Sequence, residues 1–107
     1  MPHIRLRFVE PDLASARAIT LFDRLTEVVG CERSWFTLEI VATVFIDTGT
    51  EEPARPFAEV LAFPRAPEVK KAVATILSEE LRGDADYLTT VFLDIGEGNY
   101  FENGELV

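Results

Sequence analysis

The sequence predicts a single α+β domain over residues 1–107, in which two β-α-β halves form a four-stranded mixed sheet with two helices on one face. Segments with period-two or β-branched character alternate along the chain with segments whose apolar side chains recur at helical spacing. Each half reads strand, proline, helix, glycine, strand, which indicates an internal duplication. The chain has 107 residues, 48% of them hydrophobic, which is enough for one core.

The first half begins with a strand predicted at residues 3–9, where apolar and polar side chains alternate strictly. One face of this strand carries Ile4, Leu6 and Phe8, and the other carries His3, Arg5 and Arg7. Pro11 then opens a helix, and Gly30 stands where a left-handed C-terminal cap is expected. β-Branched and aromatic residues predict a long second strand over residues 35–46, followed by a loop over residues 47–56.

The second half repeats this order. A third strand is predicted at residues 57–63, and Pro67 fits the first turn of a second helix whose expected C-terminal cap is Gly83. A fourth strand is predicted at residues 87–95, and the Asn103-Gly104 dipeptide predicts a tight hairpin in the tail. Because parallel β-α-β units have right-handed crossovers, both helices are expected to cover the same face of the sheet.

The other face of the sheet is predicted to be polar and charged. It is expected to carry His3, Arg5, Arg7, Thr37, Glu39 and Glu59. Bases on one strand and acids on its neighbours predict cross-strand ion pairs. Glu39 and Glu59 could form an acid/base pair, but structural pairing with arginine is the favoured interpretation. The face is either open to solvent or, as we favour, closed by oligomerisation.

The composition excludes several classes of function. A net charge of −9 argues against nucleic acid or an anionic membrane as partner, since phosphate binding needs a basic face. No apolar run approaches the roughly 20 residues of a membrane span. The N-terminal segment lacks the pattern of a signal peptide, so a cytoplasmic protein is expected. With one cysteine, Cys31, and one histidine, His3, a disulfide framework and a zinc site of several histidines are excluded.

Pro2 is the candidate catalytic residue. Proline after the initiating methionine usually permits removal of that methionine, and the chain then begins with a secondary amine. An α-amino group titrates near about pH 7.7–8.0, and desolvation or a nearby arginine lowers its pKa. The neutral amine can act as a general base or attack a carbonyl. If Met1 is retained, the nitrogen belongs to an amide and this chemistry is lost.

The sequence resembles a known superfamily over nearly its whole length. The features that carry the resemblance are Met-Pro opening directly into a strand, the duplicated β-α-β halves, the length and the C-terminal hairpin. Four local strings add to it: Met1-Pro-His-Ile-Arg-Leu-Arg7, Phe36-Thr-Leu-Glu39, Pro56-Phe-Ala-Glu-Val-Leu61 with Phe63 and Arg65, and Tyr100-Phe-Glu-Asn-Gly104. The chain is similar to the tautomerase superfamily, in size to its macrophage migration inhibitory factor branch. Its local strings resemble a small bacterial family of unknown function, DUF1904.

The resemblance implies a homotrimer in which an amino-terminal proline lies in a pocket at the subunit interface. There it moves a proton between the carbon and the oxygen of a keto acid, without a metal or an organic cofactor. Carried over to this chain, Pro2 matches the catalytic proline and Arg65 matches a position that lines the pocket and can bind a carboxylate. Phe101 matches the aromatic residue that forms a wall of the pocket.

The sequence also departs from the pattern of the inhibitory-factor branch. That branch has a lysine directly after the glycine that ends the first helix, where this chain has Cys31. Arg33, two residues further on, is the alternative cation. The tyrosine and asparagine of the fourth strand are replaced by Thr89 and Val91. Tyr100 is the remaining candidate proton donor.

Three functional hypotheses follow. The first is a cofactor-free tautomerase, or a related lyase or hydratase, that acts on a small 2-oxo acid. The second is a non-catalytic oligomeric binding or interaction protein on the same fold, which the missing partner residues favour. The third is a ferredoxin-like dimer that senses a small molecule, with which the order of elements is compatible.

Overall fold

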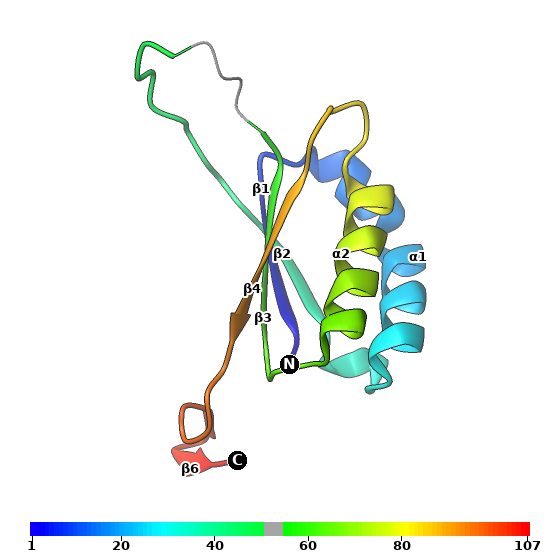
Figure 1. The fold of residues 1–107 in the computed structure, drawn as a ribbon, viewed down its shortest axis with the longest axis vertical. Helices are drawn as coiled ribbons and strands as arrows, with labels where there is room; N and C mark the ends of the chain where they lie inside the picture. Colours follow the sequence, from blue (N-terminus) through cyan, green and yellow to red (C-terminus); the bar gives the residue numbers. More distant parts are fainter. Residues whose placement is uncertain (51–54) are drawn as a thin grey trace.

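The computed structural model describes residues 1–50 and 55–107 and contains two helices packed on one sheet (Figure 1). The first half comprises β1 (His3–Arg7), α1 (Pro11–Val29), the 3-10 turn η1 (Arg33–Trp35) and β2 (Thr37–Val41). The second half comprises β3 (Phe57–Ala62), α2 (Pro67–Leu81) and β4 (Thr89–Asp94), followed by the hairpin strands β5 (Phe101–Glu102) and β6 (Glu105–Leu106).

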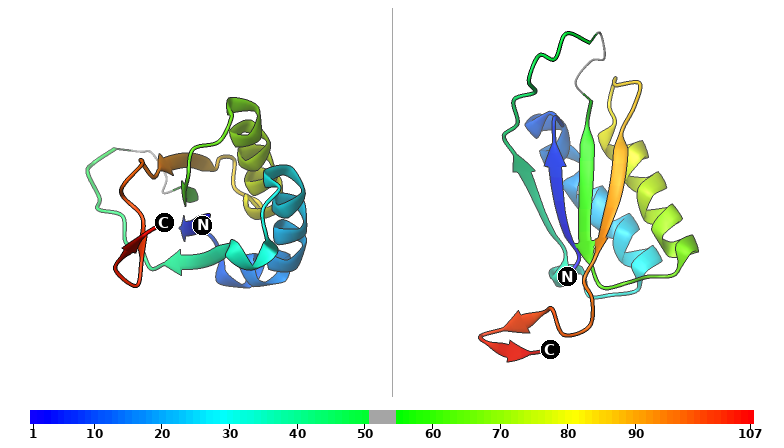
Figure 2. Two further views of the ribbon diagram at one scale, coloured as in Figure 1. Left: turned by 90° about the horizontal axis from the view of Figure 1, so that it is seen from below. Right: turned by 60° about the vertical axis from the view of Figure 1, so that its left-hand side comes forward.

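The four long strands form a mixed sheet in the order β2-β1-β3-β4. Strand β1 pairs parallel with β2 and antiparallel with β3, and β3 pairs parallel with β4. Each half is therefore a parallel β-α-β unit, and α1 and α2 lie side by side on the same face of the sheet (Figures 1 and 2). The predicted fold class and the duplicated order of elements are confirmed.

Local signals explain where the helices begin and end. Each helix has a proline in its first turn, where the missing N–H has no intrahelical partner to lose. Gly30 ends α1 in the left-handed conformation, with φ 73°, and its N–H donates to the carbonyl of Thr26 at 2.9 Å. Arg82 is the C-cap residue of α2, and Gly83, which the sequence predicts as the cap, follows it by one position in the left-handed conformation with φ 59°.

The core lies between the sheet and the two helices. Its fully buried large side chains are Ile4, Leu6, Leu21, Leu25, Leu77 and Leu81. Ile4 and Leu6 alternate with the charged residues of β1, so the period-two pattern places one set against the helices and the other set on the opposite face. No helix in the described part of the chain is both long and apolar enough to cross a membrane.

All four strands of the sheet are shorter than the sequence predicts, and β2 is shortened most, from residues 35–46 to Thr37–Val41. In the ladder between β1 and β2, Arg7 pairs with Val41, and both strands end there. Residues 42–46 run on past the end of β1 and are not part of the ladder, so their strand-like composition is not sufficient to make them a strand. Residues 51–54 of the predicted loop lie outside the described residues.

Phe8 is a second correction to the sequence prediction. We expected it beside Ile4 and Leu6, but it has φ 60° and its side chain is 48% exposed. Val9 is buried in its place. The Phe8 ring meets the Phe45 ring edge-on, with 4.9 Å between centroids. The chain leaves the sheet at Phe8, because α1 begins only three residues later and must cross to the helix layer.

The opposite face of the sheet carries the predicted cross-strand ion pairs. Glu39 Oε1 lies 3.0 Å from both His3 Nε2 and Arg5 Nε, and the His3 ring also contacts the Thr37 hydroxyl. The hydrogen bond from His3, helped by Arg5, holds the pKa of Glu39 below its usual value. Arg7 Nη1 lies 2.6 Å from Glu59 Oε1. These contacts support the structural interpretation of both glutamates.

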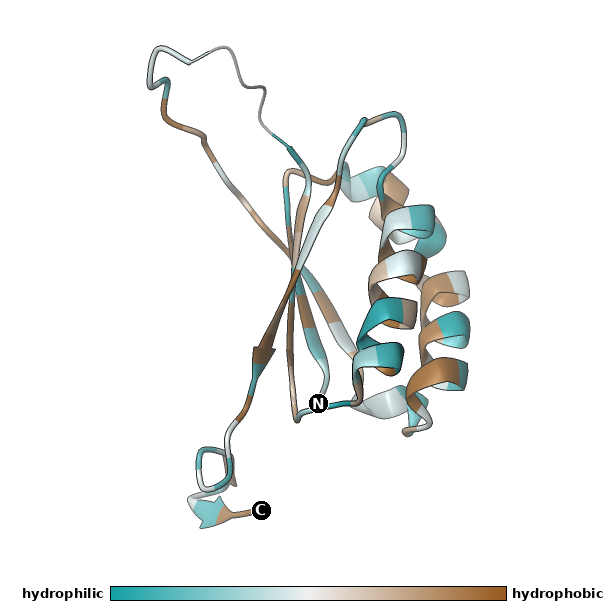
Figure 3. Ribbon diagram, viewed as in Figure 1, coloured by the Kyte–Doolittle hydropathy of each residue, from teal (hydrophilic) through white to brown (hydrophobic). Residues whose placement is uncertain are grey.

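Several large apolar side chains of the described residues are exposed. They include Val44, Phe45 and Ile46 after β2, Val91 and Leu93 on β4, and Phe101, Leu106 and Val107 in the tail. Figure 3 shows hydrophobic residues on the segment that follows β2 and along β4. The β5–β6 hairpin extends from the end of the sheet at which the N-terminus lies (Figure 2).

Candidate active site

Pro2 lies directly before β1 and is buried. Its carbonyl accepts a hydrogen bond of 3.2 Å from the backbone N–H of Thr37, which ties the start of β1 to β2. Because side chains alternate along the strand, Pro2 shares the helix-facing side of the sheet with Ile4. Its position between sheet and helices therefore follows from the register of β1.

A small cavity of about 20 Å³ adjoins Pro2. It is lined by Pro2, Ile4, Val29, Phe36, Val60, Ala62, Phe63, Arg65, Lys70, Val73 and Phe92. A volume of this size admits roughly one water molecule. All of these residues belong to the described part of the chain, and Arg65 and Lys70 alone among them carry a charge. The cavity is thus an apolar space with two cations and no lining carboxylate.

Arg65 follows β3 and lies half-buried in front of α2. Its Nη1 donates to the carbonyl of Phe63 at 2.9 Å and to that of Pro64 at 3.3 Å. These two bonds fold the guanidinium back over the end of β3 and hold it at the cavity. The structure therefore places Arg65 at the same cavity as Pro2.

Lys70 is the cavity residue that the sequence analysis missed. It lies in the first turns of α2, and its Nζ is 2.7 Å from Asp94 Oδ2 and 5.5 Å from the centroid of the Phe92 ring. One signal could have found it: Lys70 precedes Val73 of the apolar stripe by three residues, so it borders the buried face of the helix. The docking of α2 on the sheet then decides which part of the sheet this buried face covers.

Arg33 lies outside the cavity. Its guanidinium is paired with Asp23 of α1, donates to the carbonyl of Ile19 at 3.2 Å and lies 5.8 Å from the Phe22 ring centroid. It lines an open hollow of about 640 Å³ together with Cys31, Trp35 and Arg65, among others. Arg65 and Val29 border both spaces, so the hollow adjoins the Pro2 cavity.

Tyr100 and Phe101 do not line the Pro2 cavity within one chain. The Tyr100 ring packs edge-on against Phe63, with 5.1 Å between centroids, and Phe63 borders the cavity. The Tyr100 hydroxyl donates to Glu102 Oε1 at 3.0 Å, and this bond raises the pKa of Tyr100. Phe101 is 56% exposed on the hairpin.

Thr89 and Val91 also lie away from Pro2. In the β3–β4 ladder they pair with Phe57 and Glu59, on the charged face of the sheet. The helix-facing position of β4 at the cavity is Phe92 instead. Within one chain, neither Thr89 nor Val91 lies near Pro2, so neither can take the place there of the tyrosine and asparagine that the macrophage migration inhibitory factor branch has on its fourth strand.

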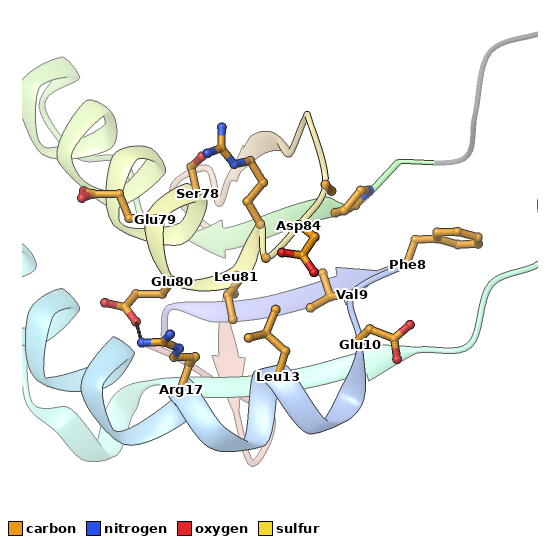
Figure 4. A pocket seen from close by; sticks show the side chains of 14 residues that line it. Phe8, Val9, Glu10, Leu13, Arg17, Ser78, Glu79, Glu80, Leu81 and Asp84 are labelled. Atoms are coloured by element: carbon orange, nitrogen blue, oxygen red, sulfur yellow. Dashed lines mark ion pairs between the residues drawn. The ribbon is translucent and has the colours of Figure 1, made fainter.

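A larger hollow, of about 710 Å³, lies at the other end of the sheet (Figure 4). It is open and lies between the start of α1 and the end of α2, and it contains none of the predicted site residues. Its most buried acid, Glu80, already lies 3.0 Å from Arg24 Nη1 and 3.7 Å from Arg17 Nη1. Chemistry at a buried amine needs desolvation and nearby cations, so the smaller Pro2 cavity is the better candidate site. No group of three or more potential metal ligands occurs among the described residues.

Comparison with protein families gives one match. The model for the family described as "Domain of unknown function (DUF1904)" matches residues 1–106. No curated protein matches the chain. The chain is 35% identical to a crystal structure of a DUF1904 domain from Sebaldella termitidis ATCC 33386. The match covers 97% of each chain, with a TM-score of 0.86.

More distant structures share the fold. A protein described as "Q0 fused 4-OT wild type symmetric trimer" is 18% identical with a TM-score of 0.70, over 98% of this chain and 94% of that one. A macrophage migration inhibitory factor-like protein from Entamoeba histolytica is 14% identical with a TM-score of 0.63, over 97% and 96%. The chain therefore has the tautomerase, or macrophage migration inhibitory factor-like, fold that its sequence resembles.

Proposed function

The chain belongs to the family described as domain of unknown function DUF1904, and we propose that it is a cofactor-free keto–enol tautomerase, or a related lyase or hydratase, acting on a small 2-oxo acid. The observation that carries this proposal is the burial of Pro2 in an apolar cavity whose charged residues are Arg65 and Lys70. The proposal requires removal of Met1, which makes the Pro2 nitrogen a secondary amine.

The surroundings of Pro2 suit a general base. Burial disfavours the protonated amine, and the positive charges of Arg65 and Lys70 disfavour it further. Both effects lower the pKa of the free amine, so that more of it is neutral at neutral pH. A neutral amine can then accept a proton from carbon.

The proton transfer takes place in two steps. The Pro2 nitrogen takes a proton from the carbon next to the ketone, and the electrons of that C–H bond form the C=C bond of an enolate. The resulting Pro2 ammonium then gives the proton to the enolate oxygen, which yields the enol and restores the amine. Arg65 binds the carboxylate of the substrate, since a guanidinium can hold both oxygens. Phe63 and Phe92 contact its apolar part.

The active form in this proposal is a cytoplasmic homotrimer. The cavity in one chain, at about 20 Å³, is too small for a 2-oxo acid, so the ligand extends past Arg65 into the adjoining hollow. Apolar side chains on the hairpin and after β2 are exposed and available to a second copy. The fused 4-OT structure with the same fold is described as a trimer. Sedimentation equilibrium should therefore give three times the mass of the chain, and a monomer would contradict this part.

Intact mass and Pro2→Ala test the proposed activity. The mature protein should lack the mass of Met1. Conversion of phenylpyruvate between its enol and keto forms should fall by about 10²-fold or more in Pro2→Ala, the range expected for loss of a general base. Pro11→Ala, which changes an exposed proline at the start of α1, serves as the matched control. Equal rates for Pro2→Ala and the native sequence would favour a non-catalytic oligomeric binding protein instead.

A further inference from the structure

Lys70 contacts both the Pro2 cavity and a carboxylate outside it. Its side chain lines the cavity beside Phe92, while its Nζ donates to Asp94 Oδ2 at 2.7 Å. Asp94 is the last residue of β4 and is not among the residues that line the cavity. The side chains of Lys70 and Asp94 are 29% and 40% exposed, respectively, so the pair lies at the rim of the site.

The two cations of the cavity are held in different ways. Arg65 is bonded to the backbone carbonyls of Phe63 and Pro64, which cannot swing away by a change of rotamer. Lys70 is held by a side chain, on a flexible stem that ends in a compact charge. An ion pair as exposed as this one is weak, so exchanging one carboxylate for another costs little. Lys70 can therefore change partners where Arg65 cannot.

Among the described residues that line the cavity, Arg65 and Lys70 are the charged ones. His3, Glu39 and Glu59 lie on the opposite face, in the ion pairs of β1 with its neighbours. Arg33 is paired with Asp23 of α1. Within the cavity itself, the net charge thus depends on Arg65, on Lys70 and on whether Asp94 compensates Lys70.

We propose that Asp94 is a resident carboxylate that holds Lys70 until the carboxylate of a small ligand displaces it. Asp94 thereby competes with the ligand and sets the affinity of the Pro2 cavity for monocarboxylates. This inference rests on the proposed function only for the nature of the ligand. Lys70 is a ligand-binding residue here, and Asp94 acts through Lys70 as a positioning residue.

The competition predicts effects of opposite sign for the two partners. The probe is 3-phenylpropanoate, a carboxylate of the shape of phenylpyruvate that cannot enolise, titrated calorimetrically into the full-length protein. Asp94→Asn should tighten its binding by about threefold, the scale of an exposed ion pair. Lys70→Met should weaken it by about tenfold, the scale of one hydrogen bond to a charged group. Lys70→Arg, which keeps the charge, should restore most of the affinity.

The double variant Lys70→Met/Asp94→Asn separates competition from a structural role. If Asp94 acts through Lys70, Asp94→Asn has no effect once Lys70 is replaced. Lys71→Met, at the exposed neighbour on α2, and Asp84→Asn, in the loop after α2, are the matched controls and should bind like the native sequence. Thermal unfolding of each variant establishes that it is folded before it is titrated.

Three results would overturn the inference: weaker or unchanged binding in Asp94→Asn, an effect of Asp94→Asn that persists without Lys70, or no binding of 3-phenylpropanoate to the native protein. These titrations are independent of turnover. If they succeed while Pro2→Ala keeps full activity, the proposed function fails and the carboxylate exchange stands. If Pro2→Ala is inactive and the titrations fail, the proposed function stands and the carboxylate exchange fails.

Discussion

Replacing Arg65 by methionine removes the guanidinium from the Pro2 cavity and leaves an unbranched side chain. In the structure only Nη1 is engaged, with the carbonyls of Phe63 and Pro64, and among the described residues Nε and Nη2 donate no hydrogen bond. The remaining N–H groups can hold a carboxylate through charge-assisted bonds, each worth about 1.5–3 kcal/mol. Loss of about 2–3 kcal/mol corresponds to a decrease of about 30- to 150-fold in kcat/KM.

The decrease should appear mainly in KM. The carboxylate is bound equally in the substrate and in the transition state, so its loss removes uniform binding and leaves kcat nearly unchanged. The assay is the change in ultraviolet absorbance as the enol of phenylpyruvate becomes the ketone. Arg65→Lys should recover part of the lost KM, since it keeps the charge but not the planar fork.

Arg82→Met, at an exposed arginine directly after α2, is the matched control for this prediction. It should behave like the native sequence in both kinetic constants. An unchanged KM in Arg65→Met, combined with inactivity of Pro2→Ala, would refute the role of Arg65 while leaving the catalytic proline in place. A fall in kcat alone would mean that Arg65 acts on the reacting atoms instead of the carboxylate.

Three further predictions concern the fold. Leu77→Ala removes a fully buried side chain from the helix–sheet core and should lower the free energy of unfolding by about 2–5 kcal/mol in urea titrations; an unchanged midpoint would mean that this part of the core is loosely packed. Gly83→Ala should destabilise by about 1 kcal/mol or more, because φ is 59° and an added Cβ would lie 3.0 Å from Leu13 Cδ2; Gly98→Ala, where a Cβ meets nothing within 4 Å at a similar φ, isolates the packing part of the cost. The pKa of Glu39 is lowered in the folded state, so its contribution is present above the ordinary value of 4.5 and is lost as the pH falls through the lower folded pKa. Glu39→Gln should therefore reduce the loss of stability on acidification below that pH, and acid titrations with the same slope in both proteins would contradict this.

The sequence predicted the elements well because the signals for them are local. Alternation at Ile4 and Leu6 orients β1, prolines open both helices, Gly30 caps α1, and Gly83 lies one residue past the cap of α2. Each of these signals depends on the backbone of a few neighbouring residues. The ends of the strands were less predictable, because a residue such as Phe45 is strand-like in composition but has no partner in the ladder.

The candidate site was predicted in part. Pro2 and Arg65, which the family resemblance singled out, both line the cavity: Pro2 directly precedes β1, and Arg65 lies three residues after β3. Lys70 was missed, and Arg33 was expected nearer to Pro2 than it lies. The rotation of α2 about its own axis turns Lys70 toward the cavity, whereas the ion pair with Asp23 holds Arg33 against α1.

The sequence by itself determined the α+β class, the duplicated halves and the placing of Pro2 at the start of a buried strand. The signals from hydrophobic periodicity, proline and glycine each involve only a few neighbouring residues, so they can be recognised without knowledge of the fold. Only the tertiary structure decided that Pro2 meets Arg65 and Lys70, that Asp94 holds Lys70, and that Tyr100 lies on the far side of Phe63. Those contacts join residues far apart in the chain, and they depend on how the helices dock and how the strands are registered, which no local pattern specifies.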